Sequence, residues 1–248
     1  MTQLCEDVGV VPRPLGTARL WREWRTTAVQ VVLVTAAIVV YFTARGLTQA
    51  NPTRALGNAR DVVAFERWGH LYQEPTLQRL VLGHHGVIDV LNWIYIWGHW
   101  PVIVVVLLWL VHDHPERYRV LRNALFVSGC IGIVIFALFP VAPPRLAGLG
   151  LVDTVTAQSH AYRVLQPPSF VNQYAAIPSL HVGWNLLVGI FVARHARRPL
   201  LRALGVLTPV AMTAAVVLTA NHYLIDAALG AMIALAGLAI VARLSPGQ

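Results

Sequence analysis

Residues 222–244 read HYLIDAALGAMIALAGLAIVARL, and this stretch decides the fold class. Between Asp226 and Arg243 it holds no charged residue and is mostly apolar. An α-helix needs about 20 such residues to cross the hydrocarbon core of a bilayer. We therefore expect the stretch to span a membrane. His222 and Asp226 stand at its start four residues apart, a spacing that predicts both side chains on one face of the helix.

The rest of the composition agrees with a membrane protein. Of the 248 residues, 56% are hydrophobic and 12% are charged, which leaves too few charges for the surface of a soluble domain of this size. We predict an all-α polytopic membrane protein built as a bundle of six transmembrane helices. We expect these helices, with Pro101 as a kink in the second, at 26–44, 87–111, 120–139, 179–196, 200–220 and 222–244.

Outside the spans, three segments have distinct compositions. Residues 1–25 are predicted to form a cytoplasmic N-terminal tail ahead of a catalytic transmembrane domain at 26–244. Within that domain, 46–86 is too polar to span, and its helical periodicity predicts interfacial helices on the outer face. Their Glu66, Glu74 and Gln78 suit either contact with a polyol or sugar headgroup or a solvated face. Residues 140–178, rich in Pro and Gly, form a loop long enough to indicate a functional role, here an outer active-site loop.

Arginine alone supplies the positive charge, since the chain has a net charge of +8 and contains no lysine. The arginines lie in short segments between apolar runs, which favours helix orientation and lipid headgroups over nucleic acid as their partner. Twelve of them fall on the side of the two termini and seven in the longer loops of the other side. The positive-inside rule then predicts a plasma-membrane protein with both termini cytoplasmic and its candidate chemistry on the extracytoplasmic side.

A second motif begins another apolar run, at residues 177–184, which read IPSLHVGW. Pro and Ser are typical of a helix start, and they place His181 in the first turn, where unpaired backbone N–H groups favour an anion. With His222 and Asp226, this gives two histidines, a carboxylate and a helix N-terminus, a set suited to phosphoryl transfer. Cys5 and Cys130 fall in the tail and inside a span, so neither a disulfide nor a metal site is indicated.

These motifs together resemble the type 2 phosphatidic acid phosphatase superfamily, whose members carry Pro-Ser-x-His followed by His-x-x-x-Asp. The resemblance is closest to its inositol phosphorylceramide synthase branch, with Pro-Ser-Leu-His-x-x-Trp at 178–184 and His-Tyr-x-x-Asp at 222–226. A Phe-Pro-x-Ala-Pro-Pro stretch precedes them, at 139–144. The likeness covers about residues 135–235.

The resemblance implies a metal-independent enzyme without a cofactor that acts on a phosphate-linked lipid headgroup at the outer leaflet. By this resemblance, His222 attacks phosphorus and forms a phosphohistidine, Asp226 accepts the other ring N–H, and His181 protonates the departing oxygen. The synthase-like motifs favour headgroup transfer from a membrane lipid to a lipid or polyol acceptor. Simple hydrolysis of phosphatidate or polyprenyl phosphate is the alternative.

The chain departs from the phosphatases of the superfamily in its cations. It lacks their Lys-x6-Arg-Pro motif, and Val216 stands where they carry an Arg six residues before the last His. Arg145 is therefore our first candidate for binding the phosphate, together with Ser179 and the first-turn N–H groups. Arg163 is a weaker candidate, because an exposed loop charge explains it equally well.

Polar residues also recur along one face of the second span. Asn92, Tyr95 and His99 could line a headgroup pocket, or they could bond neighbouring helices.

Two interpretations from other classes stay open on the sequence alone. A non-enzymatic proton-coupled carrier could use His222 and Asp226 as a proton relay, and a haem protein could use paired histidines as axial ligands.

Overall fold

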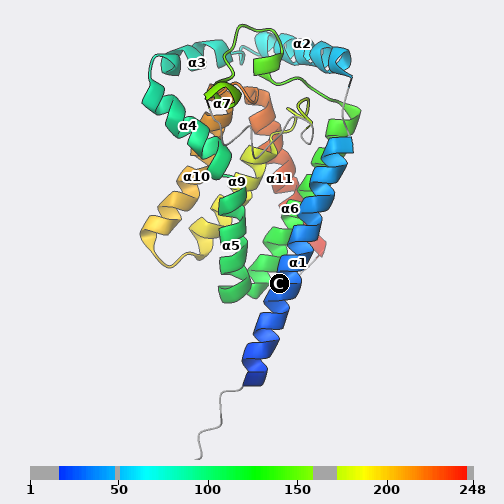
Figure 1. The fold of residues 1–248 in the computed structure, drawn as a ribbon, viewed down its shortest axis with the longest axis vertical. Helices are drawn as coiled ribbons and strands as arrows, with labels where there is room; N and C mark the ends of the chain where they lie inside the picture. The colour runs from blue at the N-terminus through cyan, green and yellow to red at the C-terminus, as the bar shows by residue number, and fades with distance from the viewer. Residues whose placement is uncertain (1–16, 48–50, 159–171, 245–248) are drawn as a thin grey trace, which may run out of the picture. The chain divides into compact units, whose positions relative to one another are not determined.

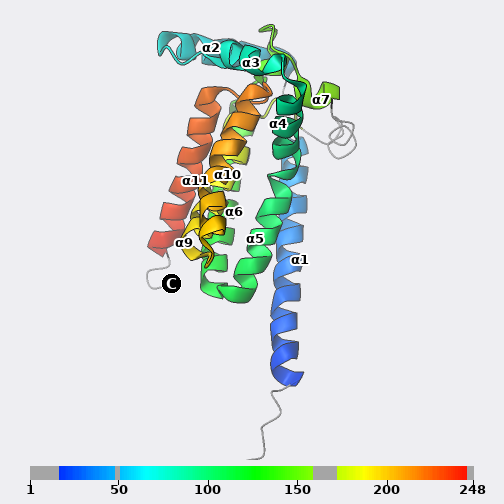
Figure 2. The ribbon, with the colours of Figure 1, turned by 90° about the vertical axis from the view of Figure 1, so that its left-hand side faces the viewer.

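The computed structural model describes residues 17–47, 51–158 and 172–244 (Figures 1 and 2). Within these ranges the chain is helical, with no strand beyond an isolated parallel bridge between Val141 and Ala175. In chain order the elements are α1 Thr17–Leu47, α2 Pro52–Trp68, α3 Glu74–Leu82, α4 His85–Trp97, α5 Trp100–Asp113, α6 Pro115–Leu138, the 3-10 turn η1 Pro144–Leu146, α7 Thr154–Gln158, α9 Leu180–His195, α10 Pro199–Leu218 and α11 Leu224–Leu244.

The chain divides into two units, Met1–Ile38 and Val39–Gln248. The described part of the first unit is the N-terminal portion of α1, which begins at Thr17 and so takes up part of the segment 1–25 that the sequence predicts as a tail. The last turns of α1 and all later elements belong to the second unit.

Helix α9 occupies the centre of the second unit, where it packs against α10, α11, α6 and α5. Glycine allows the close approaches. A Cβ added at Gly183 of α9 would overlap the carbonyl oxygen of Gly230 in α11, and one added at Gly189 would overlap that of Gly205 in α10. Small residues at such crossings let helix backbones approach closely, as in many membrane proteins.

Three helices of the described chain, α6, α10 and α11, are long and apolar enough to cross a membrane. Helices α4 and α5 taken together are also long and apolar enough to cross a membrane. They are bent by 48° at a short break and would make a fourth span. Helix α9 has 16 residues and the apolar part of α1, Ala28–Ala44, is also short. The structure therefore supports a membrane protein with three or four candidate spans, and the count of six stays a prediction.

The bend between α4 and α5 lies at Gly98 and His99 rather than at Pro101. Pro101 occupies the second position of α5. Proline is tolerated there because the first N–H groups of a helix have no partner within the helix. The interruption of the second span is thus real, but proline begins the new helix instead of kinking a continuous one.

The segment 46–86 contains helices α2 and α3, which lie crosswise over the ends of α10 and α11 (Figures 1 and 2), and their place at the outer interface stays a prediction. Helix α2 begins at Pro52, after Asn51, whose side chain accepts a hydrogen bond from the Thr53 N–H. Neither a solvated face nor a headgroup contact describes their polar residues, because Glu66 and Glu74 are fully buried against the turn before α11.

Helix α11 begins at Leu224, so His222 precedes it and does not share a helix face with Asp226. Ala220 has a left-handed backbone conformation, with φ 56°, which ends α10. The N–H groups of Asn221 and His222 then both donate to the carbonyl of Val216. This turn delays the next helix by two residues relative to the predicted start at 222.

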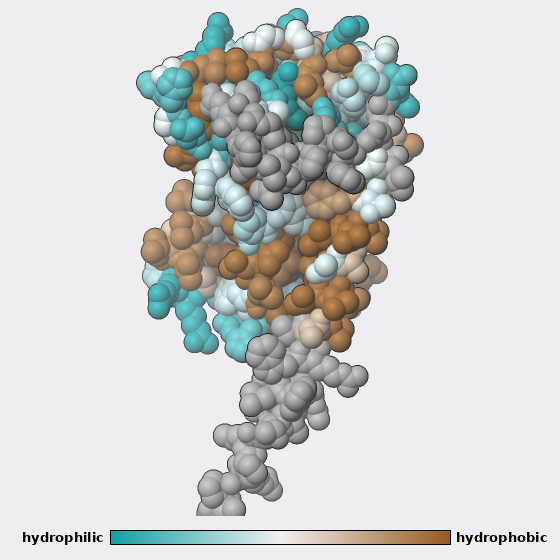
Figure 3. Space-filling model, in the orientation of Figure 1, coloured by the Kyte–Doolittle hydropathy of each residue, from teal (hydrophilic) through white to brown (hydrophobic). Residues whose placement is uncertain are grey.

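Apolar and polar side chains are unevenly distributed over the surface of the bundle. Hydrophobic residues gather over its lower half in the space-filling view, while hydrophilic ones gather at the end that carries α2 and α3 (Figure 3). Exposed large apolar residues include Val105 of α5, Leu207 of α10 and Met232 of α11. Exposed apolar surface on the outside of a bundle is what lipid contact requires.

Candidate active site

His222 lies in the turn between α10 and α11, where its side chain is almost wholly buried. Its Nδ1 is 2.8 Å from the carbonyl oxygen of Ala176 and 3.4 Å from Oδ2 of Asp226. A carbonyl oxygen only accepts hydrogen bonds, so Nδ1 carries the proton. In the neutral ring, Nε2 then holds the lone pair.

Asp226 is fully buried, and its Oδ2 also accepts the N–H of Tyr223 at 2.9 Å. In half of a capping box, the side chain of the third helical residue accepts a hydrogen bond from the backbone N–H of the residue just before the helix. Asp226 therefore fixes the start of α11 and flanks the His222 Nδ1–H, while Ala176 makes the shorter contact with that N–H. The sequence offers no signal for this carbonyl partner, because it comes from the loop at 172–179.

His181 is the second residue of α9, as the motif predicts. Its ring stacks on Tyr95 with centroids 4.8 Å apart, and the ring centroid of His222 is 5.8 Å away. The histidines of the two motifs therefore meet, although 40 positions of chain separate them.

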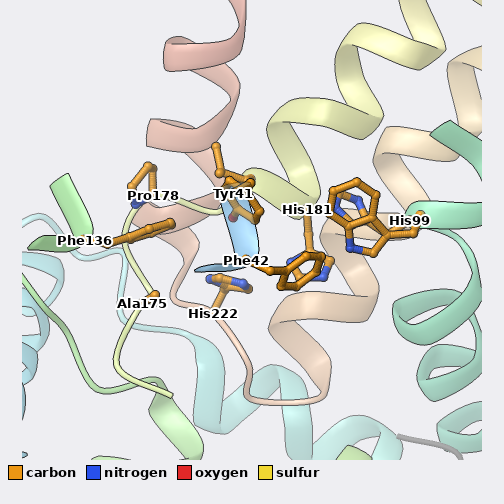
Figure 4. Close-up of a pocket in the computed structure, with 10 residues that line it drawn as sticks. Tyr41, Phe42, His99, Phe136, Ala175, Pro178, His181 and His222 are labelled. Carbon is orange, nitrogen blue, oxygen red and sulfur yellow. The ribbon is translucent and has the colours of Figure 1, made fainter. Parts of the chain in front are cut away.

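A pocket contains both rings (Figure 4). Figure 4 shows that His181 and His222 reach it from separate segments, with His99 beside His181. The pocket combines these imidazoles with aromatic side chains from the end of α1 and from α5 and α6, and its described lining is Tyr41, Phe42, His99, Trp100, Phe136, Ala175, Pro178, Leu180, His181 and His222.

His99, at the break between α4 and α5, has a defined tautomer. Asn185 of α9 places its Nδ2 3.1 Å from Nδ1 of His99 and 2.9 Å from the carbonyl oxygen of His181. The carbonyl needs a donor, which fixes the orientation of the Asn185 amide, and an amide NH₂ only donates. Nδ1 of His99 is therefore an acceptor, and the proton of the neutral ring is on Nε2.

Trp184 packs behind this group of rings. Its indole stacks on His99 with centroids 5.7 Å apart and its Nε1–H donates to Oγ of Ser128 at 3.1 Å. The pocket wall is thus held by hydrogen bonds from α6 and α9 and by ring stacking.

Arg145, the first candidate for a phosphate ligand, lies beside the residue that precedes His222. Its Nη1 donates to Oδ1 of Asn221 at 2.5 Å, and its Nε is 3.2 Å from Oδ2 of Asp153. Its backbone N–H donates to the carbonyl of Ala220. The guanidinium is close to the His222 turn but is not part of the described pocket lining.

The 139–144 stretch supports the turn from the other side. The Tyr223 hydroxyl donates to the carbonyl of Ala142 at 3.0 Å, and the Val141 N–H donates to the carbonyl of Tyr174 at 2.7 Å. This motif therefore connects the loop that carries Ala176 to the turn that carries His222.

Of the other predicted site residues, the structure brings some to the pocket and places others elsewhere. Ser179 precedes α9, and its buried Oγ has no hydrogen-bond partner in the described structure and does not line the pocket. Tyr95 is next to His181, whereas Asn92 bonds Thr154 of α7 with both its amide atoms. Arg163 lies outside the described residues.

Sequence reasoning missed the residues that position these side chains. Asn185 follows His181 by one helical turn, a spacing that could have indicated their contact. Glu66 and Glu74 accept hydrogen bonds from the N–H groups of Ile225 and Leu224, whereas the sequence favoured a headgroup contact or a solvated face for both. Across the described residues, no three His, Cys, Asp or Glu side chains are grouped as metal ligands.

A comparison with protein families places this geometry in a known context. A family model described as the PAP2 superfamily matches residues 60–240, which include both histidine motifs. No curated protein and no solved structure shows a significant match to the chain.

Proposed function

Because the chain belongs to the PAP2 superfamily, we propose that it is a membrane-bound lipid phosphotransferase that moves a phosphate-linked headgroup through a phosphohistidine on His222. Superfamily membership by itself supports a lipid phosphatase-type enzyme. The observation that carries the finer proposal is the pair of imidazoles, His181 and His222, whose centroids are 5.8 Å apart in one pocket. One phosphate group can contact both.

In the first half-reaction, Nε2 of His222 forms a bond to phosphorus while the bond from phosphorus to the lipid oxygen breaks. His181 gives its proton to that oxygen, which leaves as an alcohol. The proton on His222 Nδ1 stays between Ala176 and Asp226, and the carboxylate stabilises the positive charge that develops on the ring. This arrangement follows the logic of a nucleophile oriented by a third group.

In the second half-reaction, His181 takes the proton from an incoming hydroxyl as its oxygen bonds to phosphorus and the bond to His222 breaks. Water as the incoming group gives hydrolysis, and an alcohol gives transfer. Backbone N–H groups at the start of α9 favour the phosphate oxygens there. Arg145 is the nearest guanidinium candidate, since it bonds Asn221 beside the nucleophile.

The charge of the pocket favours a phosphodiester substrate. The chain has no lysine, and the described lining contains histidines but no arginine. A phosphomonoester carries up to two negative charges and a phosphodiester one, so the diester needs fewer fixed cations. The aromatic side chains of Tyr41, Phe42 and Trp100 suit the apolar part of a lipid. His99 and Tyr95 are the side chains that we assign to the headgroup, with a weaker assignment for Asn92.

The experiment offers the purified protein a phospholipid labelled in its headgroup phosphate, with and without an acceptor lipid alcohol. We expect the label to appear in a new lipid only with the acceptor, and an acid-labile phosphoprotein to form in its absence. His222→Ala should abolish both. His112→Ala is the matched control, because that side chain is 85% exposed at the far end of α5.

Other outcomes would favour the alternatives. Release of inorganic phosphate from phosphatidate or polyprenyl phosphate, without transfer, would favour a simple phosphatase. Absence of any lipid turnover would favour a proton-coupled carrier, and an absorption band near that of haem would favour a haem protein.

The membrane topology is part of the same proposal. We propose six crossings, formed by α1, the α4–α5 pair, α6, α9, α10 and α11, with α2 and α3 at the interface. We place both termini in the cytoplasm and the pocket at the extracytoplasmic face of the plasma membrane. Single cysteines at Arg60 and Arg198 in a cysteine-free background test this, since a membrane-impermeant maleimide should label only the first in intact cells.

A further inference from the structure

Three consecutive backbone N–H groups directly follow His222, and each donates to a different carboxyl group. Tyr223 donates to Asp226 at 2.9 Å, Leu224 to Oε1 of Glu74 at 2.8 Å, and Ile225 to Oε1 of Glu66 at 2.9 Å. The first N–H groups of a helix have no partner within it, and negative groups are favoured at that end. Two of the three partners come from α3 and α2, more than 140 positions away in the chain.

All three carboxyl groups are completely buried, and in each the second oxygen has no hydrogen-bond partner in the described structure. Three ionised carboxylates in one dry site would repel one another and lose their hydration. Burial raises the pKa of Glu66 to about 8. The hydrogen bond from the Ile225 N–H opposes this shift, and the neighbouring Glu74 contributes to it. At neutral pH Glu66 therefore retains its proton, which lowers the charge of the cluster.

The turn that carries His222 is held between this cluster and α10. On one side the N–H groups of Asn221 and His222 both donate to Val216, and on the other the carboxyl cluster holds the next three residues. A displacement of about 1 Å at a reacting group can reduce turnover on the order of a hundredfold. Whatever fixes this turn therefore controls the position of the nucleophile.

We propose that Glu66 and Glu74 are positioning residues for the phosphotransfer reaction, which hold the His222 turn through the Ile225 and Leu224 N–H groups. The proposal rests on the proposed function for the identity of the reaction. It also gives α2 and α3 a role, because their Glu66 and Glu74 hold the turn that carries His222.

The proton on Glu66 predicts a dependence of stability on pH. The titratable groups around Glu66 are Glu74 of α3, Asp226 of α11, Tyr72 and Tyr223. Because the pKa of Glu66 is higher in the folded than in the unfolded chain, the folded state binds the proton more tightly. Its stabilising effect is complete below pH 4.5, the ordinary pKa of a glutamate, and is lost as the pH rises to about 8.

The test compares Glu66→Gln, which keeps an oxygen acceptor and mimics the protonated acid, with Glu66→Leu, which removes the acceptor. Hydrogen exchange at residues 222–226 reports the turn directly and needs no substrate. We expect Glu66→Leu to accelerate this exchange and to lower kcat by about tenfold or more with little change in KM. Glu66→Gln should keep the protection and should flatten the fall of the thermal midpoint between pH 5 and 8.

Glu116→Gln is the control, because Glu116 is exposed and pairs only with Arg119 among the described ion pairs. Wild-type exchange and kcat in Glu66→Leu would overturn the positioning role. An unaltered pH dependence of the midpoint in Glu66→Gln would overturn the protonation of Glu66 at neutral pH, even if Glu66→Leu does not fold. Absence of lipid turnover in the wild-type protein would instead refute the proposed function and leave the exchange result valid.

Discussion

Gly230 is the position at which a single methyl group should damage the site most clearly. A Cβ there would overlap the carbonyl oxygen of Ser179, inside the 3.0 Å that real Cβ contacts respect. The clash is with backbone, which cannot rotate away, so Gly230→Ala must separate the start of α9 from α11. The same contact includes the Ser179 N–H donating to the carbonyl of Asp226 at 3.0 Å.

The size of the effect follows from what these two helices carry. His181 lies two residues after Ser179, and His222 lies in the turn before α11, so a shift of about 1 Å widens the gap that one phosphate must bridge. We expect Gly230→Ala to lower kcat on the order of a hundredfold, which corresponds to about 2.7 kcal/mol of lost transition-state stabilisation. The overlap and the weakened hydrogen bond should also reduce the free energy of unfolding by about 1–3 kcal/mol.

The assay measures kcat and KM for headgroup transfer in detergent micelles, with the thermal midpoint followed by tryptophan fluorescence. Gly57→Ala is the matched control, because a Cβ at Gly57 meets nothing within 4 Å. Replacing this half-buried helical glycine, where the added methyl group has open space, should stabilise α2 by up to about 1 kcal/mol and leave turnover unchanged. If Gly230→Ala kept the wild-type kcat and midpoint, the argument that the α9–α11 contact sets the separation of the histidines would be wrong.

Three further predictions concern charge and protonation. Arg145→Met should lower the thermal midpoint, because it leaves the partly buried Asp153 without its cation, and Arg145→Met combined with Asp153→Asn should recover part of the loss in a double-mutant cycle. Turnover should persist in EDTA, since imidazoles and N–H donors supply the chemistry, and complete loss with rescue by Mg²⁺ would contradict this. The pH–rate profile should be bell-shaped, because His222 must be neutral and His181 protonated, and a rate that rises monotonically from pH 5 to 9 would count against these roles.

The sequence identified the helices whose periodicity and apolar length are local properties. It predicted the positions of α6, α9 and α10 to within a few residues, except that α6 begins at Pro115 rather than at 120. Its errors fall where a non-local contact decides the outcome. The start of α11 depends on the Val216 carbonyl and on carboxyl groups from α2 and α3, and no pattern within 222–244 reports those partners.

The candidate site shows the same division. The motifs by themselves indicated His181, His222 and Asp226 as candidates, and the structure brings these residues together. The sequence also determined the membrane class, because apolar length and the scarcity of charge are sums over residues. Only the tertiary structure decided that Ala176 bonds the ring of His222, that Asn185 fixes His99, and that Glu66 and Glu74 are buried against the turn that carries His222. Each of these contacts joins segments distant in the chain, and which atoms meet there depends on how the helices pack.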